Sequence, residues 1–117
     1  MQYKFTIPIR NVPTNQAYRF SKVMYMTPKC RLFQASVIDV LAKNFAEIKP
    51  IKRKVKLTID LMFKSAKSCD IDGIKPLVDC LNGLVIEDDS QIDILHVYKH
   101  TNSEIDAIEM VVEVIGA

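Results

Sequence analysis

The most constraining feature of the chain is a regular alternation of apolar and polar side chains over residues 52–64. Successive side chains of a strand point to opposite faces of a sheet. The alternation therefore predicts a strand with one face in a core, and it predicts a sheet that is covered on one side. Five apolar residues occupy the buried face: Val55, Leu57, Ile59, Leu61 and Phe63.

Strand patterns recur at four further places, residues 4–9, 24–27, 92–99 and 107–115. A polar loop of hairpin length separates the last two, and residues 10–23 read as a longer loop. A helical stripe runs from Pro28 to about Ala46, with Thr27 as its N-cap, and a shorter one ends at Asn82-Gly83. Helices and strands do not alternate strictly, so the order predicts an α+β fold with a mixed sheet of about four strands and two helices.

The 117 residues suit a single small domain, residues 1–117, of ordinary globular composition. No apolar run is long enough to span a bilayer, and the N-terminus lacks the apolar core of a signal peptide. The three cysteines, Cys30, Cys69 and Cys80, are odd in number and form no CxxC pair. They predict a reduced, cytoplasmic protein without a disulfide framework or a zinc ribbon.

The net charge of +2 conceals a strong asymmetry along the chain. Residues 1–67 carry 14 basic against 3 acidic side chains, whereas residues 68–117 carry 2 against 11. Such a division suggests one part that faces a polyanion and another that uses its carboxylates differently. The alternative is that two solvated faces offset each other after folding.

Carboxylates gather on both sides of the short predicted helix. Asp70 and Asp72 point to the same side if their segment is extended, and an antiparallel-like return could bring Asp88 or Asp89 beside them. Spacing alone does not choose between these last two. Three converging carboxylates suit Mg²⁺ or Mn²⁺, and Lys75 is close enough in sequence to hold a phosphate there.

Two other interpretations of these acids remain open. Aspartates before a helix often serve only as N-caps and as partners of the helix dipole. Asp-x-Asp-Gly also occurs in haloacid-dehalogenase-type phosphatases, so a metal-dependent phosphatase is a distant alternative. The histidines, His96 and His100, lie in a predicted strand about 13 Å apart and do not suggest a zinc pair.

A basic run precedes and opens the long strand, and two lysines follow it. Its members are Lys49, Lys52, Arg53, Lys54 and Lys56, with Lys64 and Lys67 at the far end. One interpretation is an edge strand that lysines protect from aggregation. The other is contact with the phosphates of a nucleic acid, which is favoured because the strand leads directly to the acidic cluster.

The motifs in this order resemble RusA-type Holliday junction resolvases over nearly the whole chain. The stretch from Asp70 through Asp-x-Asp-Gly, Lys75 and Asp79-Cys80-Leu81-Asn82-Gly83 is followed by Glu87-Asp88-Asp89-Ser90-Gln91. Residues 12–18, Val-Pro-Thr-Asn-Gln-Ala-Tyr, are similar to the Pro-Ser-Asn loop of that family. Here one residue fewer separates Asp72 from Lys75, and Gly73 can adopt the unusual dihedrals that would absorb the deletion.

The resemblance implies a homodimeric, Mg²⁺-dependent endonuclease that resolves four-way DNA junctions by paired nicks in recombination and repair. It makes Asp70, Asp72 and Asp89 the metal ligands, with Lys75 as a fourth catalytic residue. Together with the basic run it gives a DNA-binding set of Asn15, Lys52, Arg53, Lys54, Lys64 and Lys67. The family works in bacterial or phage-infected cells without a small-molecule cofactor. A non-catalytic nucleic-acid-binding protein of the same fold is the main alternative, because the Asp72-to-Lys75 spacing is shortened.

Overall fold

The computed structural model describes residues 2–12, 18–20, 24–45, 49–65 and 73–116. Their centre is a four-stranded mixed sheet in the order β1-β6-β4-β5. The strands are β1 (Gln2–Ile7), β6 (Ala107–Val114), β4 (Val55–Met62) and β5 (Ile92–His100). β4 is antiparallel to β6 and parallel to β5, and β1 is antiparallel to β6. The predicted α+β fold with a mixed sheet of four strands and two helices is confirmed.

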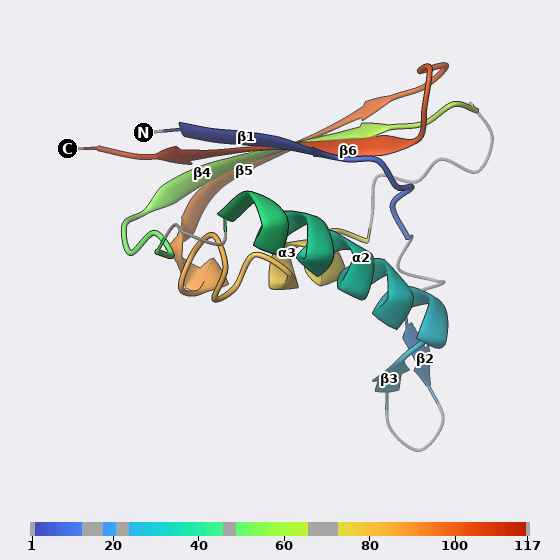
Figure 1. Ribbon diagram of the computed structural model, residues 1–117, viewed down its shortest axis with the longest axis horizontal. Coiled ribbons are helices and arrows are strands. Elements are labelled where there is room, and N and C mark those ends of the chain that lie inside the picture. The colour runs from blue at the N-terminus through green and yellow to red at the C-terminus, as the bar shows by residue number, and fades with distance from the viewer. Residues whose placement is uncertain (1, 13–17, 21–23, 46–48, 66–72, 117) are drawn as a thin grey trace.

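Both helices of the described chain lie on one face of this sheet, as Figure 1 shows. They are α2 (Pro28–Phe45) and the much shorter α3 (Ile74–Asp79). The predicted N-cap of α2 is confirmed, because the backbone N–H of Cys30 donates to the Thr27 hydroxyl oxygen at 3.3 Å. The N–H that proline lacks would have no partner within the helix at its first position, so proline costs nothing there. The sequence Thr27-Pro28 therefore favours a helix that begins at this point.

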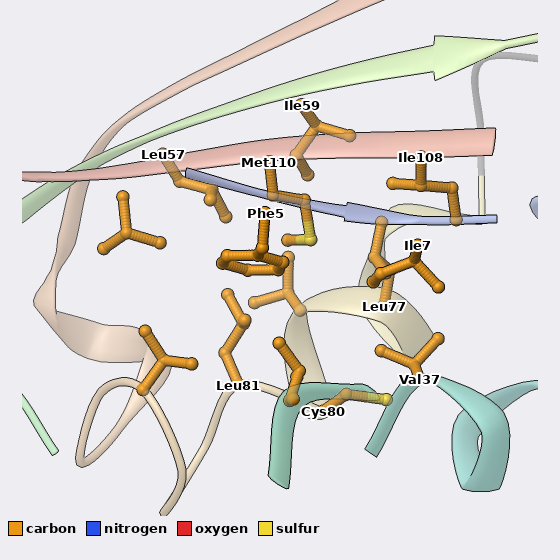
Figure 2. Packing of buried hydrophobic residues seen from close by; sticks show 14 of the residues in the cluster. Phe5, Ile7, Val37, Leu57, Ile59, Leu77, Cys80, Leu81, Ile108 and Met110 are labelled. Atoms are coloured by element: carbon orange, nitrogen blue, oxygen red, sulfur yellow. The ribbon is translucent and has the colours of Figure 1, made fainter. Parts of the chain in front are cut away.

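The core fills the space between the sheet and the helices, as Figure 2 shows. The five apolar residues expected on the inner face of the 52–64 segment are all buried there. Ile108, Met110 and Val112 line the same face from β6. Leu77 of α3 and Leu81 of the turn after it are buried in the same core. The alternation in β4 therefore does what its period predicts, because every second residue enters the core.

The opposite face of the sheet carries the other half of the alternation. Lys56, Thr58, Asp60 and Met62 of β4 are half-buried there, and no helix of the described chain lies over them (Figure 1). The expectation of a sheet covered on one side is thus met within the described residues.

Two sequence expectations about connections are wrong. The loop after β5 has the length of a hairpin, but β4 lies between β5 and β6, so these strands do not pair. Hydrogen bonds carry that loop across the end of β4: the Phe63 N–H donates to the His100 carbonyl, and the Ser103 N–H donates to the Phe63 carbonyl. The expected loop of residues 10–23 contains a strand, β2 (Tyr18–Phe20), which pairs with β3 (Met24–Met26) in the segment expected as a strand at 24–27.

Candidate active site

The acidic segment before β5 forms a short 3-10 helix, η1 (Asp89–Gln91), that Asp88 caps. The backbone N–H of Ser90 donates to Asp88 Oδ2 at 3.0 Å, and the backbone N–H of Asp88 donates to Gln91 Oε1 at 2.8 Å. These reciprocal bonds are a capping box. Hydrogen bonds from Ser90 hold the pKa of the Asp88 carboxyl below its ordinary value. The Asp88 side chain therefore stabilises the start of η1.

Asp89 is in a different position, although it is the next residue. It is exposed, and its carboxylate has no hydrogen bond or ion pair with any described residue. A carboxylate without an internal partner can bind a hard cation, which takes oxygen ligands. The local geometry thus separates two neighbouring aspartates that sequence spacing leaves equivalent.

Gln91 fastens this acidic segment to the basic run. Its amide nitrogen donates to the carbonyl oxygens of Ile51 and Arg53 at 2.7 and 2.8 Å. The backbones of Ile51 and Ile86 also form an isolated parallel bridge. Sequence reasoning missed this positioning role. The pattern Asp88-x-x-Gln91 is a recognisable capping-box signature and could have predicted part of it.

The basic run and the acidic segment consequently lie side by side. Lys52 Nζ is 3.8 Å from Glu87, and Lys54 Nζ is 3.6 Å from Asp93. Lys54 also donates to the Ser90 carbonyl at 3.4 Å. The edge-strand interpretation of these lysines is wrong, because β4 has neighbours on both sides. Contact of the basic run with the phosphates of a nucleic acid stays a prediction.

A pocket of about 310 Å³ opens beside the same run. Tyr3, Ile51 and Val114 give it an apolar and aromatic wall, and Lys49, Lys52 and Arg53 add positive charge. The guanidinium of Arg53 donates to the Gly116 carbonyl at 3.2 Å, which anchors that side chain near the end of the chain. Cationic and aromatic groups around one hollow can contact both phosphates and bases of a nucleic acid.

Lys75 lies in the first turn of α3 and is exposed. Its ammonium is 3.4 Å from Asp79 Oδ2, one turn along the same helix. Gly73, just before the helix, has φ +78° and ψ +21° in the left-handed region. The expectation that Gly73 uses dihedrals unusual for other residues is confirmed. A Cβ there would meet the Val12 carbonyl oxygen at 2.0 Å, so the chain also passes too close for a side chain.

Of the remaining candidates, Lys64 is the one that lies within the described residues. Asp70, Asp72, Lys67 and Asn15 fall outside the described residues. Lys64 follows the far end of β4, where its backbone N–H donates to Asp106. The expected antiparallel-like return after the short helix is wrong, because β5 runs parallel to β4 and the chain crosses back through α3. Whether Asp89 meets Asp70 and Asp72 is not tested by this strand direction and stays a prediction. Lys75 and Asp89 form no ion pair with each other in the structure.

The cysteines and histidines offer no catalytic group among the described residues. Burial, with the Asp79 charge and Cys30 as smaller causes, raises the pKa of Cys80 to about 12, so its thiol stays protonated and inert. Burial likewise raises the pKa of Cys30. Both of these thiols are free, and Cys69 lies outside the described residues. His100 bonds Asp60 at 2.7 Å on the open face of the sheet.

In this α+β domain, the basic run before and at the start of β4 lies beside the acidic segment that precedes β5. A basic surface next to carboxylates is typical of an enzyme that acts on nucleic acids. The sequence model described as Endodeoxyribonuclease RusA matches residues 8–113. The chain belongs to this family, and it is therefore an endodeoxyribonuclease of the Holliday junction resolvase type, a hydrolase. Nucleases of this family depend on divalent metal ions. A search of curated proteins gave no match. None of the helices in the described part of the chain has the length and apolar content needed to cross a bilayer.

Proposed function

We propose that the protein resolves four-way DNA junctions by paired, Mg²⁺-dependent nicks during recombination and repair. The observation that carries this proposal is the contact between the basic run and the segment holding Asp89, in a chain that matches the RusA family over residues 8–113. A phosphate held by the cations of Lys52 and Lys54 would then lie beside a free carboxylate, as metal-assisted phosphodiester hydrolysis requires.

Asp70, Asp72 and Asp89 are the proposed metal ligands. The exposed and unpartnered carboxylate of Asp89 fits a hard, oxygen-preferring cation, whereas the Asp88 carboxylate already accepts a backbone hydrogen bond. Mg²⁺ is the proposed metal, and Mn²⁺ would substitute because it accepts the same ligands. When bound, the cation supplies an activated water and offsets the charge that develops on the phosphate.

Lys75 is the proposed catalytic lysine. Its ammonium is a mobile point charge whose i,i+4 partner, Asp79, is only an exposed helical pair, a kind that contributes about 0.3–0.5 kcal/mol. Such a pair can open, so that the ammonium exchanges the carboxylate for a phosphate oxygen. Lys52, Arg53, Lys54, Lys64, Lys67 and Asn15 are the proposed DNA contacts.

The enzyme is proposed to act as a homodimer in the cytoplasm of a bacterial or phage-infected cell. Resolution requires two nicks in opposed strands, and a two-fold dimer presents two equivalent sites to a junction with the same symmetry. The two buried free thiols of the described chain agree with a reducing compartment.

The test is cleavage of a labelled four-way junction and of a linear duplex, with Mg²⁺, Mn²⁺ or EDTA. Asn at Asp70, Asp72 or Asp89 is expected to abolish cleavage and to leave junction binding intact or stronger, because each change removes a negative charge that faces phosphate. The matched control is Asp88→Asn, which keeps an oxygen that can cap η1 and is expected to be mild. Equal loss of cleavage at Asp88 and Asp89 would contradict the assignment, and cleavage that persists in EDTA would contradict the metal dependence.

A further inference from the structure

The two edges of the sheet differ strongly within the described chain. At one edge, β1 is short and its outward-facing residues, Gln2, Lys4 and Thr6, are polar and exposed. A short edge strand that carries lysine is protected against pairing with another strand. At the other edge, β5 is nine residues long and hydrogen-bonds to β4 alone. Every second residue of β5 therefore directs its N–H and C=O away from the sheet.

Apolar side chains accompany this open edge. Ile94, Leu95 and Tyr98 remain 40%, 46% and 49% exposed. They project to both faces of the sheet, because Ile94 and Tyr98 are aligned with open-face residues of β4 and Leu95 with a core-facing one. A long edge with exposed apolar groups on both faces is the kind of edge to which another strand adds.

The sequence of β5 is complementary to itself in one antiparallel register. If His96 faces its own copy, Leu95 lies opposite the partner's Val97 and Ile94 opposite the partner's Tyr98. In the same register Asp93 lies opposite the partner's Lys99, so unlike charges meet. Moving the register by one pairing step puts Asp93 against the partner's Val97, or Lys99 against the partner's Leu95. The neighbouring registers thus oppose a charge to an apolar group, and the centred one does not.

We propose that β5 is the homodimer interface, where two copies pair antiparallel about His96 to form a continuous eight-stranded sheet. The proposal rests on the homodimer in the proposed function and specifies its surface and register. The two-fold axis is perpendicular to the sheet at His96, so the helices of both copies lie on the same side. The first residue of β5 then lies roughly 27 Å from its copy, because the strand rises about 3.4 Å per residue. Asp89, just before β5, would be presented twice at opposite ends of the interface.

The first test is a charge reversal measured by sedimentation of the full chain without DNA. Asp93→Lys and Lys99→Asp each place like charges together twice per dimer, and each is expected to raise the dissociation constant of the dimer by roughly tenfold. The double variant, Asp93→Lys with Lys99→Asp, is expected to restore dimerisation to within about threefold. The double variant still lacks the ion pair between Asp93 and Lys54 of the same subunit. Restored dimerisation would therefore come from the contact between subunits and not from that pair.

Glu104→Lys is the matched control, because it changes the net charge as Asp93→Lys does at an exposed residue outside β5. It is expected to leave dimerisation unchanged. A double variant as weak as the single variants would overturn the register. A wild-type chain that stays monomeric at tens of micromolar would overturn the interface.

The second test locates the axis by cross-linking. In a Cys69→Ser background, His96→Cys is expected to give a disulfide-linked dimer under mild oxidation, since facing residues of antiparallel strands are about 4.5–5.5 Å apart at Cα. Thr58→Cys is the control: it is the β4 neighbour of His96, and its two copies would be about 14 Å apart. A dimer that forms without cross-linking at residue 96 would refute this interface and leave a homodimer through another surface. Junction cleavage by a chain that sediments as a monomer would refute the proposed homodimer itself.

Discussion

Gly73 offers the sharpest test of how the chain enters α3. The residue combines a left-handed backbone, φ +78°, with a backbone contact so close that a Cβ would lie 2.0 Å from the Val12 carbonyl oxygen. The left-handed conformation alone costs a non-glycine residue about 1–2 kcal/mol. The contact adds a separate penalty, because Val12 and Asn11 are buried and have little room to withdraw. Overpacking of this kind typically costs about 1–3 kcal/mol.

We therefore expect Gly73→Ala to lower the free energy of unfolding by about 3 kcal/mol, or the melting temperature by roughly 12 °C. Gly83→Ala is a matched control, since Gly83 has nearly the same dihedral, φ +81°, but no atom within 4 Å of the added Cβ. Its expected loss is only the dihedral part, about 1–2 kcal/mol. Urea denaturation followed by circular dichroism measures both values.

The difference between the two variants isolates the close approach to Val12. Equal losses at Gly73 and Gly83 would refute the reasoning, because the backbone contact would then contribute nothing. Gly73→Val is expected to be worse than Gly73→Ala, since a branched side chain reaches the left-handed region even less readily. Because Gly73 sets the start of α3, the same variants are expected to lower junction cleavage more than junction binding.

Three further predictions concern charge and ionisation. Neutralising Lys52, Arg53 and Lys54 together is expected to flatten the log–log salt dependence of junction affinity, by about 0.9 for each lost phosphate contact; an unchanged slope in a titration of binding against salt would mean that the run touches no DNA. Lys75→Ala is expected to lower the single-turnover cleavage rate by about 10²-fold or more with little change in junction affinity, and Lys75→Arg to rescue poorly; near-normal cleavage would exclude this lysine from catalysis. Burial raises the pKa of Cys80 from 9.0 to about 12, so the folded state holds this proton more tightly. Its contribution to stability is complete below pH 9 and is lost as the pH rises towards 12, and urea midpoints are expected to fall more steeply in that window for the wild type than for Cys80→Ala.

Local patterns predicted the parts of the fold that depend on neighbouring residues. The alternation in β4 and the Thr27-Pro28 cap both rest on interactions within a few residues, and both are confirmed. The order of the strands could not be predicted in this way. The loop after β5 is short enough for a hairpin, yet β5 pairs with β4, because pairing is decided by which strands bury their apolar faces together.

The site shows the same division between local and distant effects. Spacing could not distinguish Asp88 from Asp89, although the capping-box pattern with Gln91 is local and visible in the sequence. The meeting of residues 51–53 with Gln91 joins segments some 40 residues apart, and no short motif encodes it. The roles of Asp70, Asp72 and Lys67 stay predictions from the sequence, since these residues lie outside the described ones.

Folding brings lysines of the basic half beside carboxylates of the acidic half, and the ion pairs that result are weak. Lysines 52, 54 and 56 each face a carboxylate from the acidic half, Glu87, Asp93 and Glu113, at 3.6–3.8 Å. These distances are beyond those of a tight charge-assisted hydrogen bond, and both partners in each pair are accessible to water. Exposed pairs of this kind contribute about 0–1 kcal/mol.

Lys52 and Lys54 therefore lie near the acidic segment and are bound to it only weakly. A DNA phosphate would therefore replace a carboxylate in such a pair at little cost. On this argument the internal pairs do not compete seriously with DNA. They keep Lys52 and Lys54 beside the segment that holds Asp89, where a DNA phosphate would replace the carboxylates.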